Sequence, residues 1–278
     1  MNIVITGANG FLGREFERLL QNTEHALYPT NRNILDVSDR QAVDEFFKNN
    51  KIDIVLHTAF VGVKNNIKNS EKHMIENLLM HKNIARHSPD YRLMFSFGSG
   101  AAFDRKKKID SIPESELPFR YPLDYYGMAK NTIARNIIKY NGNIINLRLF
   151  GCFGPLEQDT RLIKNSINRA VKNKSIIIHQ DKKMDFFYVD DLLKVIMFCA
   201  DNYKEDLPKD INMSYREKLK LSEIGAQIKN LTGRPVGVII NNKTIGAPYT
   251  GDPSLLQSLG IDLNGLEIGI ENMVGGAA

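Results

Sequence analysis

The stretch Thr6-Gly7-Ala8-Asn9-Gly10-Phe11-Leu12-Gly13 decides the fold of this chain, because it lies between two segments of different pattern. The residues before it, 2–6, form a short apolar run that predicts a buried strand. Residues 11–20 carry apolar side chains at helical spacing and predict an amphipathic helix. The sequence therefore opens with a strand, a glycine-rich turn and a helix.

Three glycines in this turn, Gly7, Gly10 and Gly13, have the spacing of the dinucleotide-binding pattern. The first permits a tight turn, the second lets the backbone approach a pyrophosphate, and the third lets the helix pack closely on the strand. The N-terminus of the helix then presents free N–H groups and a partial positive charge to the phosphates. The turn therefore predicts a bound dinucleotide cofactor.

Strands and helices alternate through the first half of the chain. Strands are predicted at residues 26–28, 52–57, 92–97 and 144–149, and helices at 39–49, 70–87 and 126–140. This order predicts an α/β fold with a doubly wound parallel sheet of the Rossmann type. Beyond residue 150 the pattern loosens, with helices at 162–172, 189–200 and 222–231 and strands at 175–179 and 210–213. We expect a Rossmann domain at 1–150 and a smaller mixed substrate-binding lobe at 151–278, interleaved with the last strands of the sheet.

Composition and charge argue against several other classes of protein. The 278 residues are 42% apolar and 25% charged, which is typical of a globular protein. No apolar run approaches the roughly 20 residues that span a bilayer, and no signal-peptide pattern is present, so we expect a cytoplasmic protein with no membrane contact. The net charge of +5 is scattered apart from a basic run at 105–108, which predicts a solvated loop and no nucleic-acid partner. Cys152 and Cys199 lack metal-binding spacing, and we expect no metal site.

The end of the second predicted strand indicates which cofactor binds. NAD-binding domains usually place an acid there to bind the ribose 2′-hydroxyl. Residues 27–32 contain no acid and end in Arg32, whose planar guanidinium can pair with a 2′-phosphate. The sequence therefore favours NADP(H) over NAD(H).

A candidate catalytic set lies on a later helix and strand. Tyr126 and Lys130 are four residues apart on one predicted helix and share a face. The lysine ammonium favours tyrosinate, so that the tyrosine can exchange a proton near neutral pH. Ser99 follows the strand at 93–97, where active-site residues of parallel sheets gather. Ser96 is the alternative serine, and Ser99 is preferred because it lies beyond the predicted strand.

With these residues in place, the chain resembles the extended short-chain dehydrogenase/reductase family, of the NAD-dependent epimerase/dehydratase type. The resemblance rests on residues 6–13, 55–59 (Val-Leu-His-Thr-Ala), 147–155 (Leu-Arg-Leu-Phe-Gly-Cys-Phe-Gly-Pro) and 185–191 (Asp-Phe-Phe-Tyr-Val-Asp-Asp), and on Asn77, Ser99, Tyr126 and Lys130. It implies a set of cofactor-binding residues: Gly7, Asn9, Gly10, Phe11, Leu12, Gly13, Arg32, Asp36, Val37, Thr58, Ala59, Phe60, Asn77 and Lys130.

Within the family, the chain is similar to GDP-fucose synthases and related 4-keto-6-deoxysugar reductases, which use NADPH and carry an arginine at the position of Arg32. Those synthases also epimerise their substrate with a cysteine and a histidine, and these positions are Ala101 and Arg161 here. Neither a methyl group nor a guanidinium moves a proton at neutral pH. We therefore expect reduction without epimerisation.

The resemblance implies an NADPH-dependent reductase of a nucleotide-linked 4-keto-6-deoxysugar, as in bacterial-type surface-sugar biosynthesis, that works as a homodimer. Met184 stands where the family usually has an arginine that contacts the nucleotide phosphates, and Lys182 and Lys183 are the two candidate replacements. The substrate-binding residues are predicted to be Phe153, Arg161, Lys183 and Tyr188. Two alternatives remain open: a nucleotide-sugar epimerase that keeps its NAD(P) tightly bound, and a non-catalytic NADP-binding sensor or scaffold.

Overall fold

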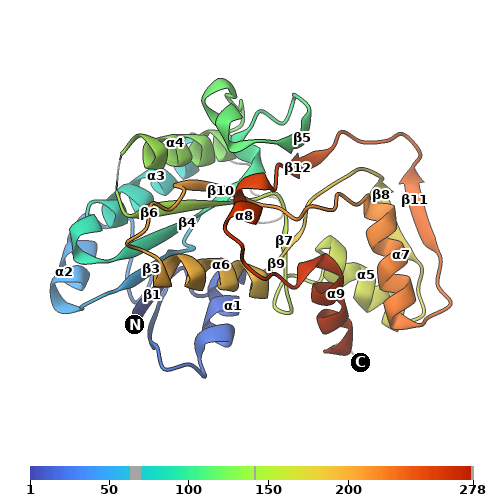
Figure 1. The fold of residues 1–278 in the computed structure, drawn as a ribbon, viewed down its shortest axis with the longest axis horizontal. Helices are drawn as coiled ribbons and strands as arrows, with labels where there is room; N and C mark the ends of the chain where they lie inside the picture. The colour runs from blue at the N-terminus through green and yellow to red at the C-terminus, as the bar shows by residue number, and fades with distance from the viewer. Residues whose placement is uncertain (63–69, 141, 277–278) are drawn as a thin grey trace. The chain divides into compact units, whose positions relative to one another are not determined.

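A six-stranded sheet forms the centre of the computed structural model, which describes residues 1–62, 70–140 and 142–276 (Figure 1). Its strand order is β10-β6-β4-β3-β1-β2. The strands are β1 (Asn2–Thr6), β2 (Ala26–Thr30), β3 (Ile54–His57), β4 (Leu93–Ser99), β6 (Ile144–Leu149) and β10 (Asp210–Met213). The chain runs parallel in β1 with β2, β1 with β3 and β3 with β4. The predicted Rossmann-type α/β fold is confirmed.

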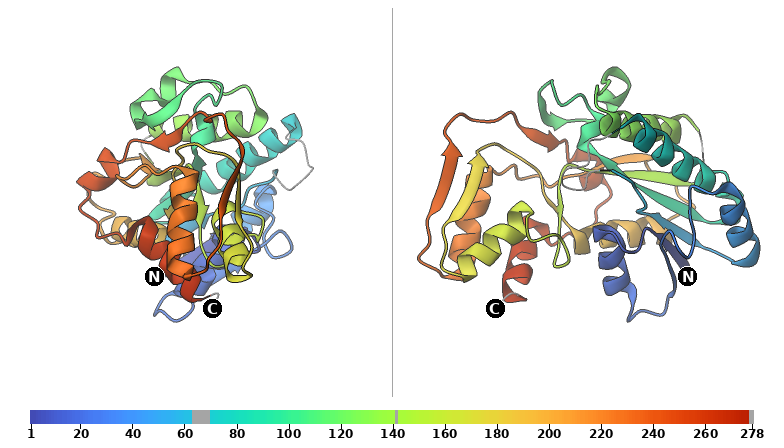
Figure 2. Two further views of the ribbon diagram at one scale, coloured as in Figure 1. Left: turned by 90° about the vertical axis from the view of Figure 1, so that its right-hand side faces the viewer. Right: turned by 180° about the vertical axis from the view of Figure 1, so that it is seen from behind.

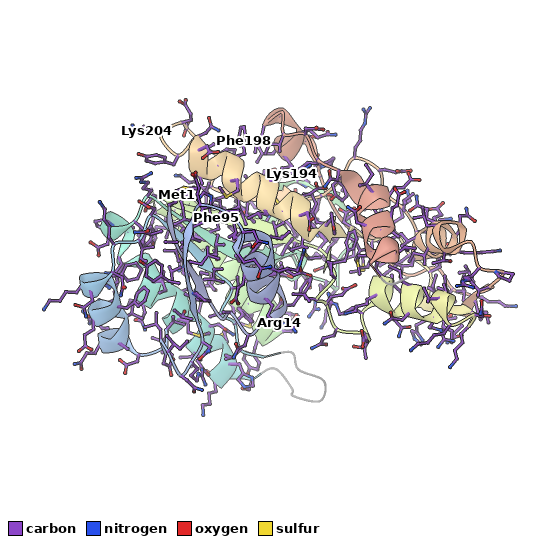
Figure 3. The ribbon with its side chains drawn as sticks, turned by 90° about the horizontal axis from the view of Figure 1, so that it is seen from below. Met1, Arg14, Phe95, Lys194, Phe198 and Lys204 are labelled. Atoms are coloured by element: carbon purple, nitrogen blue, oxygen red, sulfur yellow. The ribbon has the colours of Figure 1, made fainter. Side chains whose placement is uncertain are left out.

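Helices cover both faces of this sheet. Those on one face are α2 (Arg40–Asn49), α3 (Glu71–Ala85) and α4 (Tyr125–Lys139) (Figure 1). The opposite face carries α1 (Phe11–Leu20) and the part of α6 (Val189–Asp201) that follows Val195. Figure 3 looks onto that second face, with Arg14 on α1 and Phe198 on α6. The sheet is therefore enclosed by apolar layers, and Val4, Val55 and Met94 are almost fully buried between it and the helices.

The chain divides into two compact units. The first unit holds residues 1–106, 114–148 and 195–211, and the second holds 107–113, 149–194 and 212–278. Three two-stranded pairs lie in the second unit: β8 (Ile176–Gln180) with β11 (Val238–Asn242), β5 (Ile109–Ile112) with β12 (Tyr249–Gly251), and β7 (Cys152–Phe153) with β9 (Phe187–Tyr188). Its helices are α5 (Leu162–Val171), α7 (Leu221–Thr232), α8 (Ser254–Ser258) and α9 (Gly265–Gly275), of which α5 and α7 pack together beside β8 and β11 (Figure 2).

Several elements differ from the sequence-based expectation. The strands β5, β7, β9, β11 and β12 and the helices α8 and α9 were not predicted. Strand β2 continues to Thr30 through Pro29, which a sheet tolerates because β2 lies at its edge. Strand β4 continues to Ser99, so this serine is the last residue of the strand rather than part of the following loop.

None of the helices in the described ranges is both long enough and apolar enough to cross a membrane.

Candidate active site

The glycine turn joins β1 to α1 where the strand order changes direction, with β2 on one side of β1 and β3 on the other. Gly7 has a φ of +70°, and a Cβ there would lie 2.7 Å from the Cα of Ala59. A Cβ on Gly13 would lie 2.6 Å from the Cα of Ala8. Both positions require glycine, and Gly10, the N-cap of α1, has no side chain to cover the N–H groups of the first turn. The predicted roles of the glycines agree with this geometry.

A cavity of about 540 Å³ opens over the turn in the first unit. Its lining includes Gly7, Asn9, Gly10, Arg32, Thr58, Ala59 and Phe60. A smaller adjoining cavity of about 160 Å³ is lined by Arg32, Asp36 and Val37, among others. Phe11, Leu12 and Gly13 belong to the first turn of α1, where Gly13 is buried. The cavity and the bare helix N-terminus are of the kind that fits a dinucleotide.

Arg32 lies between two carboxylates. Its guanidinium is hydrogen-bonded and ion-paired with Glu76 of α3, and its Nε lies 3.7 Å from Oδ2 of Asp36. The hydrogen bond to Glu76 is the largest influence on the pKa of Arg32, which is raised. Burial raises the pKa of Asp36, but hydrogen bonds from Ser38 and the charge of Arg32 outweigh it and leave this pKa below its usual value. No local sequence pattern indicated that Glu76 would meet Arg32.

Asn77 supports the cavity wall from behind. Its side-chain oxygen accepts a hydrogen bond from the Val61 N–H at 2.8 Å, and its amide donates to the Val61 carbonyl at 2.8 Å. The side chain is buried and does not line the larger cavity. Asn77 therefore fixes the segment after β3 whose residues Thr58, Ala59 and Phe60 face that cavity.

Tyr126 and Lys130 lie on the first turns of α4, as predicted. Asp124 caps this helix by accepting a hydrogen bond from the Gly127 N–H at 2.9 Å. The Lys130 Nζ donates to the carbonyl of Phe97 at 2.6 Å and lies 3.8 Å from the centre of the Phe60 ring. The Tyr126 ring contacts the same Phe60 edge-on, with centroids 5.3 Å apart. Lys130 thus joins α4 to the end of β4, and burial lowers its pKa to about 7.

Ser99 lies two residues beyond the Phe97 carbonyl that Lys130 contacts. Its hydroxyl accepts a hydrogen bond from the Ala101 N–H at 3.2 Å, and the residue is 8% exposed. The alternative, Ser96, stands level with His57 on the neighbouring strand, within the sheet. The structure therefore brings Ser99 and Lys130 to the same end of β4, and it places Tyr126 one helical turn before Lys130.

Two buried histidines lie close to this region. The Nδ1 of His57 is 2.9 Å from the Thr6 hydroxyl, and its ring centre is 6.1 Å from that of His81 on α3. Burial, together with the charges of His81 and Lys130, lowers the pKa of His57 to about 3. Burial and the charge of Lys130 lower the pKa of His81 to about 4. Both imidazoles are neutral at pH 7, which favours a packing role for them.

The predicted substrate-binding residues lie in the second unit, in two kinds of environment. The rings of Phe153 and Tyr188 are buried and tilted against each other with centroids 5.2 Å apart, and a Cβ on Gly269 would lie within 2.8 Å of both. These two rings form core in the second unit. Arg161, the N-cap of α5, and Lys183 are exposed.

A buried ion pair in the second unit was not expected from the sequence. The Nζ of Lys218 lies 2.9 Å from Oδ2 of Asp185, and Asp185 also accepts hydrogen bonds from Ser214 and from the Gly251 N–H. The exposed Lys183 pairs through its backbone with Lys220. The Asp185–Lys218 ion pair and its hydrogen bonds link three segments that are far apart in the sequence, and for this reason local pattern did not reveal it.

Residues 3–214 match the model of the NAD-dependent epimerase/dehydratase family. The chain belongs to this family of enzymes, whose members work with a nicotinamide dinucleotide, and the predicted family is confirmed.

Similar proteins act on nucleotide-linked sugars. The chain is 21% identical over 255 residues to GDP-L-colitose synthase from Yersinia pseudotuberculosis, covering 84% of this chain and 82% of that protein. The structure of GDP-mannoheptose C4 reductase from Campylobacter jejuni, with NADP bound, is similar with a TM-score of 0.84 and 22% identity, covering 99% and 98% of the two chains. A GDP-L-fucose synthetase from Naegleria fowleri bound to NADP gives 0.80 and 16%, covering 99% and 91%. The structural matches establish a shared fold.

Proposed function

We propose that this chain is an NADPH-dependent reductase of a nucleotide-linked 4-keto-6-deoxysugar, of the kind used in bacterial-type surface-sugar biosynthesis. The observation that supports the proposal is the position of Lys130. Its Nζ contacts the Phe97 carbonyl near the end of β4 and lies over the ring of Phe60, a residue that lines the cofactor cavity and also packs against Tyr126. The named relatives act on GDP-linked sugars, which supports the substrate class.

The proposed mechanism divides the work among three side chains. NADPH, when bound, supplies the hydride that reduces the sugar carbonyl. The Ser99 hydroxyl donates a hydrogen bond to the carbonyl oxygen and orients it. Tyr126 donates its phenolic proton to that oxygen as negative charge develops there. The Lys130 ammonium stabilises the resulting tyrosinate and can also bind the nicotinamide ribose hydroxyls.

Reduction is favoured over epimerisation by two side chains. Inverting a carbon next to a ketone requires a base on one face and an acid on the other. Ala101 is a buried methyl group directly after the Ser99 turn, and Arg161 carries a guanidinium that stays protonated. The second enzyme candidate is an epimerase that keeps its cofactor tightly bound and inverts C4, because that reaction needs only hydride transfer and Tyr126. A sensor or scaffold is disfavoured by the presence of Ser99, Tyr126 and Lys130 together.

The cofactor is proposed to be NADP(H) rather than NAD(H), with Arg32 binding the 2′-phosphate. We expect NADPH to bind at least about tenfold more tightly than NADH, a difference of about 1.4 kcal/mol. Arg32→Ala should remove most of this preference, and Arg40→Ala, which deletes an exposed arginine on α2, should retain it. Fluorescence titration with the two reduced cofactors measures both affinities. Equal affinities in the native protein would contradict the assignment.

We propose that the two units divide the function. The first unit, which holds most of residues 1–150, binds the cofactor, and the second unit, which holds most of residues 151–278, binds the substrate. In the second unit, Arg161 and Lys183 are the candidates for contact with nucleotide phosphates, because both cations are exposed. Phe153 and Tyr188 are proposed to shape the substrate site through packing, since both rings are buried. We propose a cytoplasmic location, where nucleotide-linked sugars are made.

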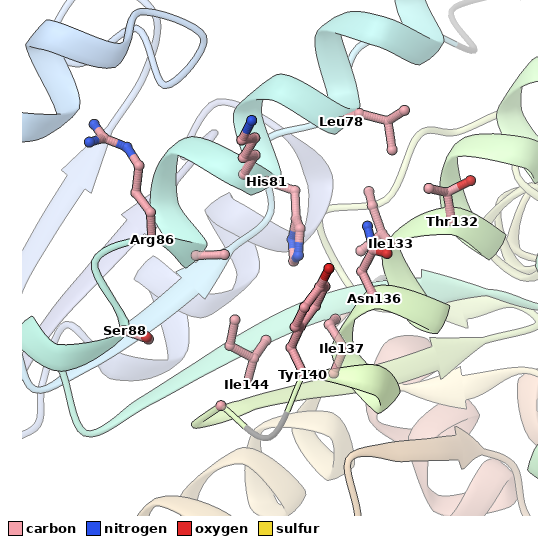
Figure 4. A pocket seen from close by; sticks show the side chains of 13 residues that line it. Leu78, His81, Arg86, Ser88, Thr132, Ile133, Asn136, Ile137, Tyr140 and Ile144 are labelled. Atoms are coloured by element: carbon pink, nitrogen blue, oxygen red, sulfur yellow. The ribbon is translucent and has the colours of Figure 1, made fainter.

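A homodimer is proposed through the outer face of α3 and α4. These two helices pack against each other, and the large apolar side chains exposed on them and at the C-cap of α4 include Ile75, Leu79, Met128, Ile138 and Tyr140, each at least 37% exposed. Between them lies a groove of about 590 Å³ with Leu78 and His81 on one wall and Ile133 and Ile137 on the other (Figure 4). A second copy presenting the same face would complete a four-helix interface.

This interface predicts an oligomeric state that one substitution should change. We expect the native protein to sediment as a dimer and Ile138→Glu to sediment as a monomer, because a charge would then be buried in the interface. Ile239→Glu, which alters an exposed isoleucine on β11, is the control and should remain dimeric. A native protein that is monomeric at micromolar concentration would exclude the proposed interface.

A further inference from the structure

Glu76 occupies an unexpected place in the proposed cofactor site. It projects from α3 into the wall of the larger cavity, on the same lining as Arg32, Gly7 and Gly10. Its carboxylate is hydrogen-bonded to the guanidinium of Arg32, and its side chain is 22% exposed. An acid therefore contacts the cation that the sequence assigned to the 2′-phosphate of the cofactor.

The position of Glu76 is fixed by its surroundings. Ser70 caps α3 by accepting a hydrogen bond from the His73 N–H at 3.4 Å, and the neighbouring Asn77 is held by two hydrogen bonds to Val61. The helix therefore cannot shift easily relative to the segment after β3. The backbone at Glu76 is therefore held near the segment after β3, and from there its carboxylate reaches Arg32.

The charges around Arg32 do not favour a phosphate as strongly as a free arginine would. One guanidinium faces two carboxylates, Glu76 and Asp36, so the three groups carry one net negative charge at neutral pH. A 2′-phosphate brings up to two further negative charges to this point. A ribose 2′-hydroxyl brings none and can donate a hydrogen bond to a carboxylate.

Asp36 and Glu76 differ in how strongly they depend on Arg32. Asp36 accepts hydrogen bonds from the backbone N–H of Ser38 at 2.9 Å and from its hydroxyl at 2.6 Å, and it lies 3.7 Å from the arginine. Glu76 is bonded to the arginine directly. Neutralising Glu76 should therefore free the Arg32 guanidinium for a phosphate more than neutralising Asp36 would.

We propose that Glu76 sets how strongly this protein distinguishes NADP(H) from NAD(H), because its carboxylate competes with a 2′-phosphate for the Arg32 guanidinium. The inference rests on the proposed dinucleotide site and names a specificity-determining residue within it. Arg32 creates a preference for NADP(H) over NAD(H), and Glu76 reduces this preference, so the native protein retains some affinity for NADH.

Binding of two nucleotide fragments tests the proposal without any turnover. Isothermal titration would compare 2′,5′-ADP with 5′-AMP, which differ only by the 2′-phosphate, on the native protein, Glu76→Gln and Glu71→Gln. We expect Glu76→Gln to tighten 2′,5′-ADP about fivefold to tenfold and to leave 5′-AMP unchanged or weaker. Glu71→Gln removes the same charge from an exposed site on the same helix and should leave the ratio of the two affinities unchanged.

The outcomes distinguish a failure of the role of Glu76 from a failure of the proposed dinucleotide site. If the ratio of the affinities for 2′,5′-ADP and 5′-AMP were the same in Glu76→Gln as in the native protein and in Glu71→Gln, the proposed role of Glu76 would be wrong. The proposed cofactor site would be unaffected by that result. A native protein that binds neither fragment and neither NADPH nor NADH would overturn the cofactor site itself, and the role of Glu76 with it. Glu76→Gln and native protein with equal unfolding temperatures would show that the substitution preserves the fold.

Discussion

Tyr126→Phe should lower the turnover of ketone reduction by about 10²–10⁴-fold, the usual contribution of a positioned proton donor. The substitution removes one hydroxyl and retains the ring that packs edge-on against Phe60, so the wall of the cofactor cavity keeps its shape. NADPH affinity should therefore change by less than about threefold. Steady-state kinetics with a reducible ketosugar nucleotide and a parallel cofactor titration measure the two effects separately.

Tyr125→Phe is the matched control for this experiment. Tyr125 precedes Tyr126 on α4, is 39% exposed and loses the same hydroxyl. We expect near-native turnover from it. If Tyr126→Phe also retained near-native turnover, the proton would have to come from another group, and Ser99 and His57 would be the residues to examine.

Asp210→Asn should destabilise the protein by about 3–5 kcal/mol, the cost of leaving a buried charge without its counter-charge. Asp210 forms an ion pair with Arg148, whose side chain is 0% exposed. The guanidinium also lies 4.6 Å from the centre of the Phe103 ring, so it cannot turn toward water without disturbing the core. Urea unfolding followed by circular dichroism measures the loss. Asp206→Asn, an exposed acid in the preceding loop, should change stability by less than about 0.5 kcal/mol.

The Asp210 carboxylate also connects the edge of the sheet to the segment that carries Ser99, the proposed catalytic serine. Asp210 of β10 accepts a hydrogen bond from the Asn146 amide of β6 at 2.6 Å. Asn146 in turn packs against Gly98, and a Cβ on Gly98 would lie 2.6 Å from the Oδ1 of Asn146. Because Gly98 precedes Ser99, Asp210→Asn should also lower turnover in the fraction that remains folded. A variant with native stability would show that Arg148 is compensated by other groups.

Local sequence pattern predicted the parts of this protein that local physics determines. The strand–turn–helix of residues 2–20 follows from a continuous apolar run, from apolar side chains at helical spacing, and from glycines that no other residue can replace, because a Cβ on Gly7 or Gly13 would meet backbone atoms. The Tyr126–Lys130 spacing likewise required only a helix, and the helix formed. For this reason the fold class and the family were predictable from sequence.

Long-range pairings were not predictable in this way. Strand β12 pairs with β5 across about 140 residues of sequence, and β7 pairs with β9 through two residues each, too few to show a period. The contact between Arg32 and Glu76 joins the turn after β2 to the middle of α3. An acid on a helix gives no local sign that it will reach an arginine 44 residues earlier. The site residues that sequence reasoning missed are therefore those defined by tertiary contact.

The most direct test of the account is a reduction run in D₂O with unlabelled NADPH and 4-keto-6-deoxysugars linked to GDP, dTDP, UDP and CDP. One of these substrates should be reduced with consumption of one NADPH per product. NMR of that product should show protium at C4 and no deuterium at C3 or C5, because Ala101 and Arg161 provide neither base nor acid. Enzyme-dependent deuterium at C3 or C5, or conversion without NADPH consumption, would contradict the reductase assignment.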